Sequence, residues 1–80
     1  MENSSQLLSR ITITPGVMVG KPVVRGMRIT VEQILKALAS GQTIKDLVEE
    51  FPVLEEADIY ACLLYASQLV EQERVYPLSA

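Results

Sequence analysis

In "GKPVVRGMRITVEQIL", residues 20–35, one pattern of apolar residues is replaced by another. As far as Ile29 the stretch is rich in β-branched residues around Gly26, which favours an extended chain with a bulge or tight turn. From Thr30 onward the apolar residues recur at intervals of three and four, which indicates a helix. The stretch therefore predicts a β segment that leads directly into helical structure.

A second extended segment precedes this stretch. "RITIT", residues 10–14, alternates isoleucine with threonine and is followed by Pro15 and Gly16. Alternation with a period of two predicts a short, half-buried strand, and the Pro-Gly pair predicts a turn at its end. We expect residues 10–29 to form a two-stranded β arm. Because an isolated two-stranded ribbon is only marginally stable in water, the arm must pack against the rest of the domain.

The first predicted helix spans residues 31–40. Thr30, with Gln33 three residues later, fits a capping box at its start. Gly41 can take the left-handed conformation that ends a helix. Both ends of this helix are therefore marked in the sequence.

Two more helices are expected. Thr43 caps the second, residues 44–51, and Pro52 prevents it from continuing. The third, residues 55–72, begins with acidic residues that suit the positive end of the helix dipole. These elements predict a mainly α (α+β) fold, in which the short N-terminal β arm is followed by a three-helix bundle similar to helix-turn-helix domains.

The domain boundaries follow from polarity. Residues 1–9 are polar and are expected to be a flexible N-terminus, and residues 73–80 are expected to be a C-terminal tail. Residues 10–72 then form a single globular domain. A domain of this size buries a small core, so self-association is a natural source of additional stability.

Composition excludes several kinds of function. The chain has no histidine, so it lacks the usual general base and the commonest metal ligand. Cys62, the single cysteine, cannot form an internal disulfide and is expected to be a structural thiol in a reducing compartment. We therefore expect no enzymatic activity, cofactor, metal or small-molecule substrate. The apolar runs are too short to cross a membrane, so we expect a cytoplasmic protein that does not associate with membranes.

The third predicted helix is apolar on more than one side. Tyr60, Leu64 and Tyr65 add apolar surface beyond the stripe that faces the core. A helix that is apolar all round is normally buried all round, and two short helices cannot cover it. The sequence therefore predicts a homodimer whose interface is built around these three residues.

Charge is distributed unevenly along the chain. Residues 1–30 contain four basic residues and one acidic residue, a net charge of +3, whereas residues 31–80 contain three and nine, a net charge of −6. Lys21, Arg25 and Arg28 give the β arm the sign that suits nucleic acid or an acidic partner protein. The alternative is that these residues pair with acidic helices of the same or a neighbouring subunit. Glu55, Glu56 and Asp58 open the third helix, and they make insertion of that helix into a DNA groove unfavourable.

The chain resembles domain-of-unknown-function family 433. The resemblance covers about residues 10–70 and rests on a strand that ends in proline, the segment "GKPVVRGMRI", a helix that ends in glycine, and "FP" followed by an acidic helix. Two positions depart from the family pattern. Met27 stands where threonine is usual, and Glu55 stands where serine or threonine normally caps the last helix.

The resemblance implies a function as well as a fold. Proteins of this family are similar to helix-turn-helix domains of the homeodomain-like class, which implies a prokaryotic antitoxin of a toxin–antitoxin pair, often beside a nuclease toxin of the PIN type. We therefore expect a dimeric antitoxin that binds a toxin protein and, through the basic arm, DNA. The alternative is a homodimeric protein–protein interaction module with no role on DNA.

Overall fold

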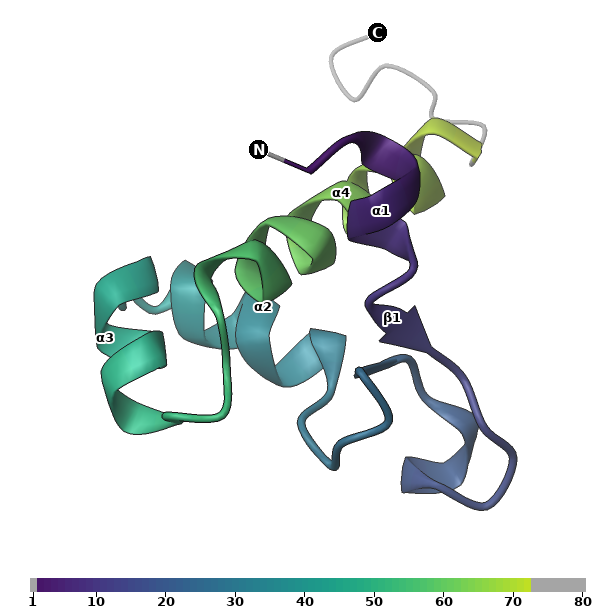
Figure 1. Ribbon diagram of the computed structural model, residues 1–80, viewed down its shortest axis with the longest axis horizontal. Coiled ribbons are helices and arrows are strands. Elements are labelled where there is room, and N and C mark those ends of the chain that lie inside the picture. Colours follow the sequence, from purple (N-terminus) through teal and green to yellow (C-terminus); the bar gives the residue numbers. More distant parts are fainter. Residues whose placement is uncertain (1, 73–80) are drawn as a thin grey trace, which may run out of the picture.

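The computed structural model describes residues 2–72, and its element order is mainly helical (Figure 1). A short helix, α1 (Ser4–Leu8), is followed by strand β1 (Ile11–Thr12), a single 3-10 turn over Met18–Gly20 and strand β2 (Val23–Val24). Three helices complete the described chain: α2 (Val31–Ala39), α3 (Ile44–Glu50) and α4 (Glu56–Gln72). The predicted mainly α architecture is confirmed, but the predicted number of three helices is wrong, because residues 2–72 contain four α-helices. The predicted tail, residues 73–80, lies outside the described residues.

The additional helix, α1, lies within the segment that was expected to be flexible. Asn3 caps it, because the Asn3 side chain accepts a hydrogen bond from the Gln6 amide (2.8 Å) and the Gln6 side chain accepts one from the Asn3 amide (3.0 Å). This reciprocal pair satisfies two amide groups that a helix start otherwise leaves without partners. Figure 1 shows α1 packed along α4, a contact that the residue contacts between these helices also indicate. Tertiary packing therefore supports a helix of only five residues.

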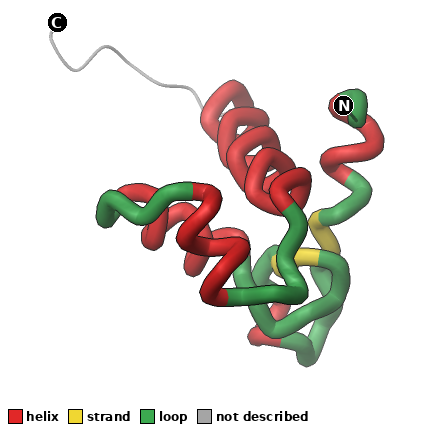
Figure 2. The backbone as a smooth tube through the Cα atoms, turned by 60° about the vertical axis from the view of Figure 1, so that its left-hand side comes forward, coloured by secondary structure: helices red, strands yellow, loops and turns green. Residues whose placement is uncertain are grey.

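The two strands form the predicted β arm; they pair antiparallel, and each is two residues long. Ile11 lies opposite Val24 and Thr12 opposite Val23. The chain then turns at Arg25 and Gly26, both with positive φ, and the Val24 carbonyl accepts a hydrogen bond from the Met27 amide (2.8 Å). The possibility of a tight turn at Gly26 is thus realised. Figure 2 shows both strands surrounded by loop segments, near the end at which α4 begins.

Helices α2 and α3 start at the predicted caps. The Thr30 side chain accepts a hydrogen bond from the Gln33 amide (3.0 Å), although Gln33 does not return the second bond of a capping box. Thr43 and Asp46 form the complete box. Gly41 has a φ of 104°, which agrees with its predicted role after the end of α2. Because these caps use only neighbouring residues, the sequence alone was sufficient to find them.

The core lies where β2, α2, α3 and α4 meet. Its largest fully buried apolar side chains come from all four elements, so that burial in the core joins them into one domain. Each fully buried aliphatic side chain contributes about 1.5–3 kcal/mol to stability. The buried cluster consists of Val24, Val31, Ile34, Leu47, Leu54, Ile59 and Cys62.

None of the helices in residues 2–72 combines the length and the apolar character that crossing a bilayer requires.

Candidate functional site

Asp58 is a charged residue that lies buried inside the structure. Its side chain lies in the first turn of α4 and is fully buried. It accepts hydrogen bonds from Arg10 (2.9 Å), from Nε and a terminal nitrogen of Arg25 (3.0 and 2.8 Å) and from the Glu55 amide (2.8 Å). Burial of a carboxylate is unfavourable unless it is paired and hydrogen-bonded, and these four bonds meet that requirement.

Two arginines from the β arm surround this carboxylate. Arg10 also pairs with Glu2 and with Glu55. Arg25, at the turn after β2, also donates to the Val53 carbonyl oxygen (2.7 Å), and its amide donates to the carbonyl of Arg10. We call this set, Asp58 with Arg10, Arg25, Glu2 and Glu55, the Asp58 cluster. It joins the N-terminal segment, the β arm and the start of α4.

The cluster changes the pKa of its members. Burial alone would raise the pKa of Asp58, but the hydrogen bonds from Arg25, from the Glu55 amide and from Arg10 hold that pKa below its usual value. The hydrogen bonds to Glu2, Glu55 and Asp58 raise the pKa of Arg10, and the bond to Asp58 raises that of Arg25. All three groups therefore stay charged at neutral pH. The cluster is a closed set of ion pairs that holds the fold together and leaves the Asp58 carboxylate no acceptor for a ligand.

The three basic residues predicted to bind a partner lie in different environments. Arg25 pairs with Asp58 of the same chain, and Lys21 pairs with Glu32 (2.9 Å). The hydrogen bonds from Lys21 and then Lys36 lower the pKa of Glu32 to about 2. Arg28 is exposed and makes no ion pair within residues 2–72. Of the predicted set, it is the cation that this part of the chain leaves available to a partner.

The residues predicted to form a dimer interface do not share one face of α4. Tyr60 is exposed, and its hydroxyl donates to Glu56 (3.1 Å), which raises the pKa of Tyr60. Leu64 is half-buried. Tyr65 is also half-buried and packs against the core from the side that faces α2. Because residues 60 and 65 are five apart, they point in different directions around a helix.

The structure adds apolar surface residues that the sequence prediction did not include. Leu63 is 42% exposed and Val70 is 59% exposed. With Tyr60 they follow a spacing of three, four and three along α4, with Ser67 between them, so they lie on one side. We call Tyr60, Leu63 and Val70 the outer face of α4. The i, i+3, i+10 spacing of these three apolar residues is a signal in the sequence that would have found it.

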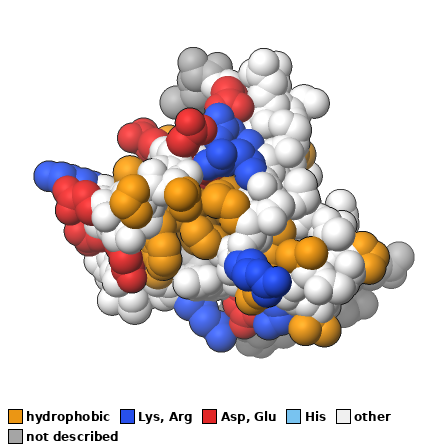
Figure 3. All heavy atoms as spheres, turned by 60° about the horizontal axis from the view of Figure 1, so that its bottom comes forward, with side chains coloured by type: hydrophobic (Ala, Val, Ile, Leu, Met, Phe, Trp, Pro, Cys, Tyr) orange, Lys and Arg blue, Asp and Glu red, His pale blue; other side chains and the backbone are white. Residues whose placement is uncertain are grey.

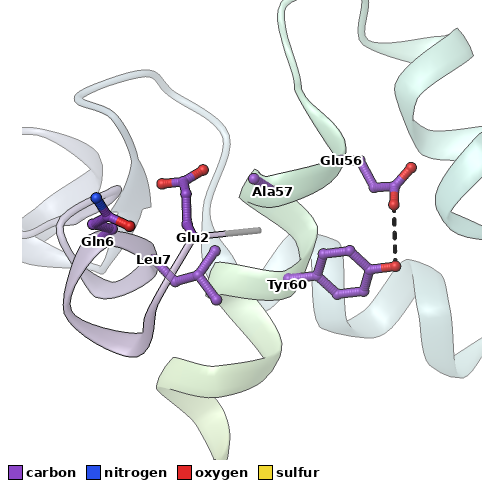
Figure 4. Close-up of a pocket in the computed structure, with 6 residues that line it drawn as sticks. All are labelled: Glu2, Gln6, Leu7, Glu56, Ala57 and Tyr60. Carbon is purple, nitrogen blue, oxygen red and sulfur yellow. Dashed lines mark hydrogen bonds between the residues drawn. The ribbon is translucent and has the colours of Figure 1, made fainter.

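A groove lies between α1 and α4 (Figure 4). It has a volume of about 760 Å³, and its walls combine apolar side chains with one carboxylate from the residues before α1 and one from α4. In Figure 4, Leu7 lies between α1 and α4 with Glu2 near it, whereas Tyr60 points from α4 away from α1, toward Glu56. The lining residues are Glu2, Gln6, Leu7, Glu56, Ala57 and Tyr60. We call it the α1–α4 groove.

A second, smaller groove of about 310 Å³ lies between α2 and the second half of α4. Its walls are almost entirely apolar, and Lys21, Glu32 and Lys36 stand at its edge, paired with one another. Its charged groups are therefore already satisfied within the chain.

The loop before β2 carries a further exposed feature. Met18, Val19 and Gly20 all have positive φ, of 49°, 58° and 73°. Val19 is 93% exposed. A hollow of about 430 Å³ beside it is also lined by Lys21 and Arg28. We call residues 18–20 the Val19 turn; it is a left-handed turn that presents an apolar side chain next to basic ones.

Charged and apolar groups adjoin one another over much of the surface. On the face shown in Figure 3, acidic side chains lie beside basic ones, and hydrophobic side chains are exposed next to them.

The thiol and the acidic side chains offer no reactive or metal-binding group in the described residues. Cys62 is buried, and its burial, together with the nearby charge of Asp58, raises its pKa to about 12, so the thiol is protonated and unreactive at neutral pH. Within residues 2–72, no three His, Cys, Asp or Glu side chains are grouped so that they could hold a metal ion.

The fold and these surfaces define a small, mainly helical domain in which a charged cluster holds an N-terminal β arm against the last helix. The chain belongs to the family described as protein of unknown function DUF433, whose model matches residues 11–66. The predicted family is thereby confirmed.

Two known proteins are similar to this chain. It is 32% identical over 56 residues to the uncharacterized protein y4eO of Sinorhizobium fredii (strain NBRC 101917 / NGR234), which covers 70% of this chain and 25% of that protein. The chain thus spans about a quarter of that relative's length. It is also similar to the crystal structure of a DUF433 member protein from Anabaena variabilis ATCC 29413, with a TM-score of 0.75 and 34% identity over 85% of this chain and 67% of that chain.

Proposed function

We propose that this chain is a small, non-enzymatic interaction domain of the helix-turn-helix-like class, which acts as a homodimer and as the antitoxin of a toxin–antitoxin pair. Its partner would be a nuclease of the PIN type, and both would act in the cytoplasm. The observation that carries the proposal is α4, which buries Ile59 and Cys62 in the core and leaves Leu63 and Val70, farther along the helix, together with Tyr60, exposed. A helix that is apolar on two sides needs a second protein surface to cover it.

The outer face of α4 is the proposed interface. Complete burial of an aliphatic side chain such as Leu63 or Val70 contributes on the order of 1.5–3 kcal/mol. The core of a domain this small leaves a narrow margin of stability, so that association through these residues would be substantial beside it. Tyr60 and Leu64, the residues predicted from the sequence, lie at or next to this face. The role of Tyr65 would then be to pack α4 on the core.

The helix-turn-helix part of the proposal is supported by the arrangement of α2, α3 and α4. Helices α3 and α4 are joined by residues 51–55 and pack against each other, and α2 packs against both. In helix-turn-helix proteins the start of the last helix meets the DNA. Here that start holds Glu56, which would face phosphates, so a protein partner is favoured over DNA.

The non-enzymatic part rests on the available side chains. The chain contains no histidine. Cys62 is buried, and its pKa of about 12 keeps it in the thiol form, which is a poor nucleophile. The free cysteine also fits a reducing compartment such as the cytoplasm.

The alternative function is a homodimeric interaction module with no role on DNA. A specific observation favours it. Arg25 and Lys21, two of the three cations expected to meet nucleic acid, pair with Asp58 and Glu32 of their own chain. Arg28 alone would give only a weak, salt-sensitive attraction to phosphates.

Sedimentation velocity tests the homodimer. We expect a dimer for the wild-type protein and a folded monomer for Leu63→Lys, because a lysine on the outer face of α4 introduces a charge into the interface. Val53→Lys is the matched control, since Val53 is exposed but lies outside α4, and it should remain dimeric. A wild-type monomer at micromolar concentration would contradict the proposal.

Co-expression separates the antitoxin from the simpler module. A PIN-type nuclease encoded beside this chain should co-purify with it, and its toxicity should be suppressed. A folded homodimer that neither binds nor neutralises such a nuclease would exclude the antitoxin role and leave the interaction module.

A further inference from the structure

The Val19 turn has a backbone conformation that its residues do not favour. Three consecutive residues, Met18, Val19 and Gly20, are left-handed, and only the third is a glycine. In this region the Cβ atom of an L-residue crowds the backbone, and a β-branched residue such as valine is a true outlier. The conformation therefore costs stability.

Within residues 2–72, the side chain of Val19 makes no packing contact that would offset this loss of stability. That side chain is 93% exposed, so it packs against almost nothing in its own chain. Strained backbone persists where the surrounding structure holds it, and it gathers at places where a protein binds something. Arg28 and Lys21 line the hollow beside the turn. The exposed surface of the turn thus consists of an apolar tip, Val19, with the basic side chains of Lys21 and Arg28 beside it.

The α1–α4 groove has the opposite character. Leu7, Ala57 and Tyr60 supply its apolar lining, and Glu2 and Glu56 supply two carboxylates (Figure 4). Glu2 is already paired with Arg10, whereas Glu56 makes no ion pair within the described chain. With a volume of about 760 Å³, the groove can take a turn of chain as well as a single side chain.

We infer that the Val19 turn of one copy of the chain inserts into the α1–α4 groove of a second copy, with Arg28 placed against Glu56. The inference rests on the homodimer proposed above, and it names the element that covers Tyr60. The tip is apolar where the groove is apolar, and the flank is basic where the rim is acidic, so the two surfaces are complementary.

The contact forms between copies because a single chain keeps the two surfaces apart. In Figure 1 the turn lies on the far side of β1 from α1 and α4. A dimer with two-fold symmetry would contain the contact twice, because each copy offers both a turn and a groove.

Exchange of the two charges tests the contact. Arg28→Glu and Glu56→Lys should each raise the dimer dissociation constant about tenfold or more, because each places like charges together. The double variant should return to within about threefold of the wild-type constant, because the pair is restored in reverse. Glu50→Lys is the matched control: combined with Arg28→Glu it changes the net charge equally, but it lies on α3 and should restore nothing.

Val19→Gly tests the turn itself. Glycine adopts positive φ without strain, so the variant should unfold at a higher denaturant concentration than the wild type when both are monomeric. It should also dimerise about tenfold more weakly, because the apolar tip is gone. A variant that is more stable and dimerises as well as the wild type would overturn the inference.

The outcomes separate this inference from the homodimer on which it rests. A wild-type protein that is monomeric would remove both. A dimer that is lost in Leu63→Lys but unaffected by Val19→Gly and by the charge exchange would leave the homodimer standing and overturn the docking of the turn. Weakening by Arg28→Glu without restoration by Glu56→Lys would also overturn it, because Arg28 would then meet another group.

Discussion

Arg25 and Val19 share a backbone feature and differ in everything around it. Both are non-glycine residues with positive φ, of 44° and 58°. The guanidinium of Arg25 bonds to the buried Asp58 and to the Val53 carbonyl, whereas the side chain of Val19 is 93% exposed. Long-range side-chain bonds offset the strain at Arg25, whereas at Val19 only the local backbone hydrogen bonds of the turn, from Gly20 to Val17 and from Lys21 to Met18, oppose it. The left-handed backbone at Arg25 is therefore part of the folded framework, whereas the one at Val19 presents an exposed side chain that a partner could bind.

The largest effect is expected at the centre of the Asp58 cluster. Asp58→Ala leaves Arg10 and Arg25 facing each other without their buried carboxylate, and it removes a bond to the start of α4. Loss of one partner of a buried ion pair costs about 3–5 kcal/mol, so this variant should be barely folded. Urea unfolding measures the change. Glu49→Ala, at an exposed position on α3, is the control and should change stability by less than about 0.5 kcal/mol.

Acid should weaken the same cluster. The pKa of Asp58 is lowered in the folded protein, so its ionised form stabilises the fold at neutral pH. This stability is fully present above the unfolded value of about 4 and is lost as the pH falls through the lower folded pKa. Glu32 and Asp46 also have lowered pKa values and contribute in the same range. Urea unfolding from pH 7 to pH 2 measures the free energy of unfolding of the wild type and of Asp58→Asn. The difference between the two free energies reports on Asp58 alone, and it should become smaller as the pH falls.

Glycine at position 25 would remove both the backbone strain and the side-chain bonds of Arg25. Arg25→Gly relieves about 1–2 kcal/mol of backbone strain but removes three charge-assisted hydrogen bonds. Because the side chain is 38% exposed, solvent weakens those bonds, and we expect a net loss of about 1 kcal/mol. Chemical denaturation of Arg25→Gly and of Arg28→Gln, the unpaired neighbour, should show a loss only in the first. A gain in stability for Arg25→Gly would mean that the cluster does not hold the turn.

The same substitution at Val19 should have the opposite sign. Val19→Gly relieves similar strain and removes almost no intramolecular contact. Glycine also increases the conformational entropy of the unfolded chain, which cancels part of the increase in stability. We expect an increase of about 0.5–1 kcal/mol in the free energy of unfolding of the monomer. Val53→Gly is the control, because Val53 is exposed but does not have positive φ. It should show no increase.

Much of the helical framework could be predicted from the sequence. Helices α2, α3 and α4 each begin or end within one residue of the predicted bounds. Their signals are local: Thr30 and Thr43 accept from amides three residues later, and Gly41 takes the left-handed conformation. The two-stranded arm was also predictable, because alternation followed by Pro15-Gly16 marks the first strand and β-branched residues around Gly26 mark the second. The five-residue α1 was missed because it has no apolar period, although Asn3 and Gln6 are spaced as in a capping box.

In the candidate site, too, local features could be predicted from the sequence and long-range contacts could not. Which residues are charged can be read directly from the sequence. Where the helices start, and that α4 carries more apolar surface than two short helices can cover, can also be predicted from it, because both depend on neighbours three or four residues away. By contrast, the contact of Arg25 with Asp58, 33 residues away, the contact of Arg10 with the same carboxylate across 48 residues, and the exposure of Arg28 follow from the folded arrangement alone. Such pairings depend on how the β arm and α1 pack on α4, and ion pairs of this range have no local pattern, because any arginine could reach any of the acidic residues until the fold places them.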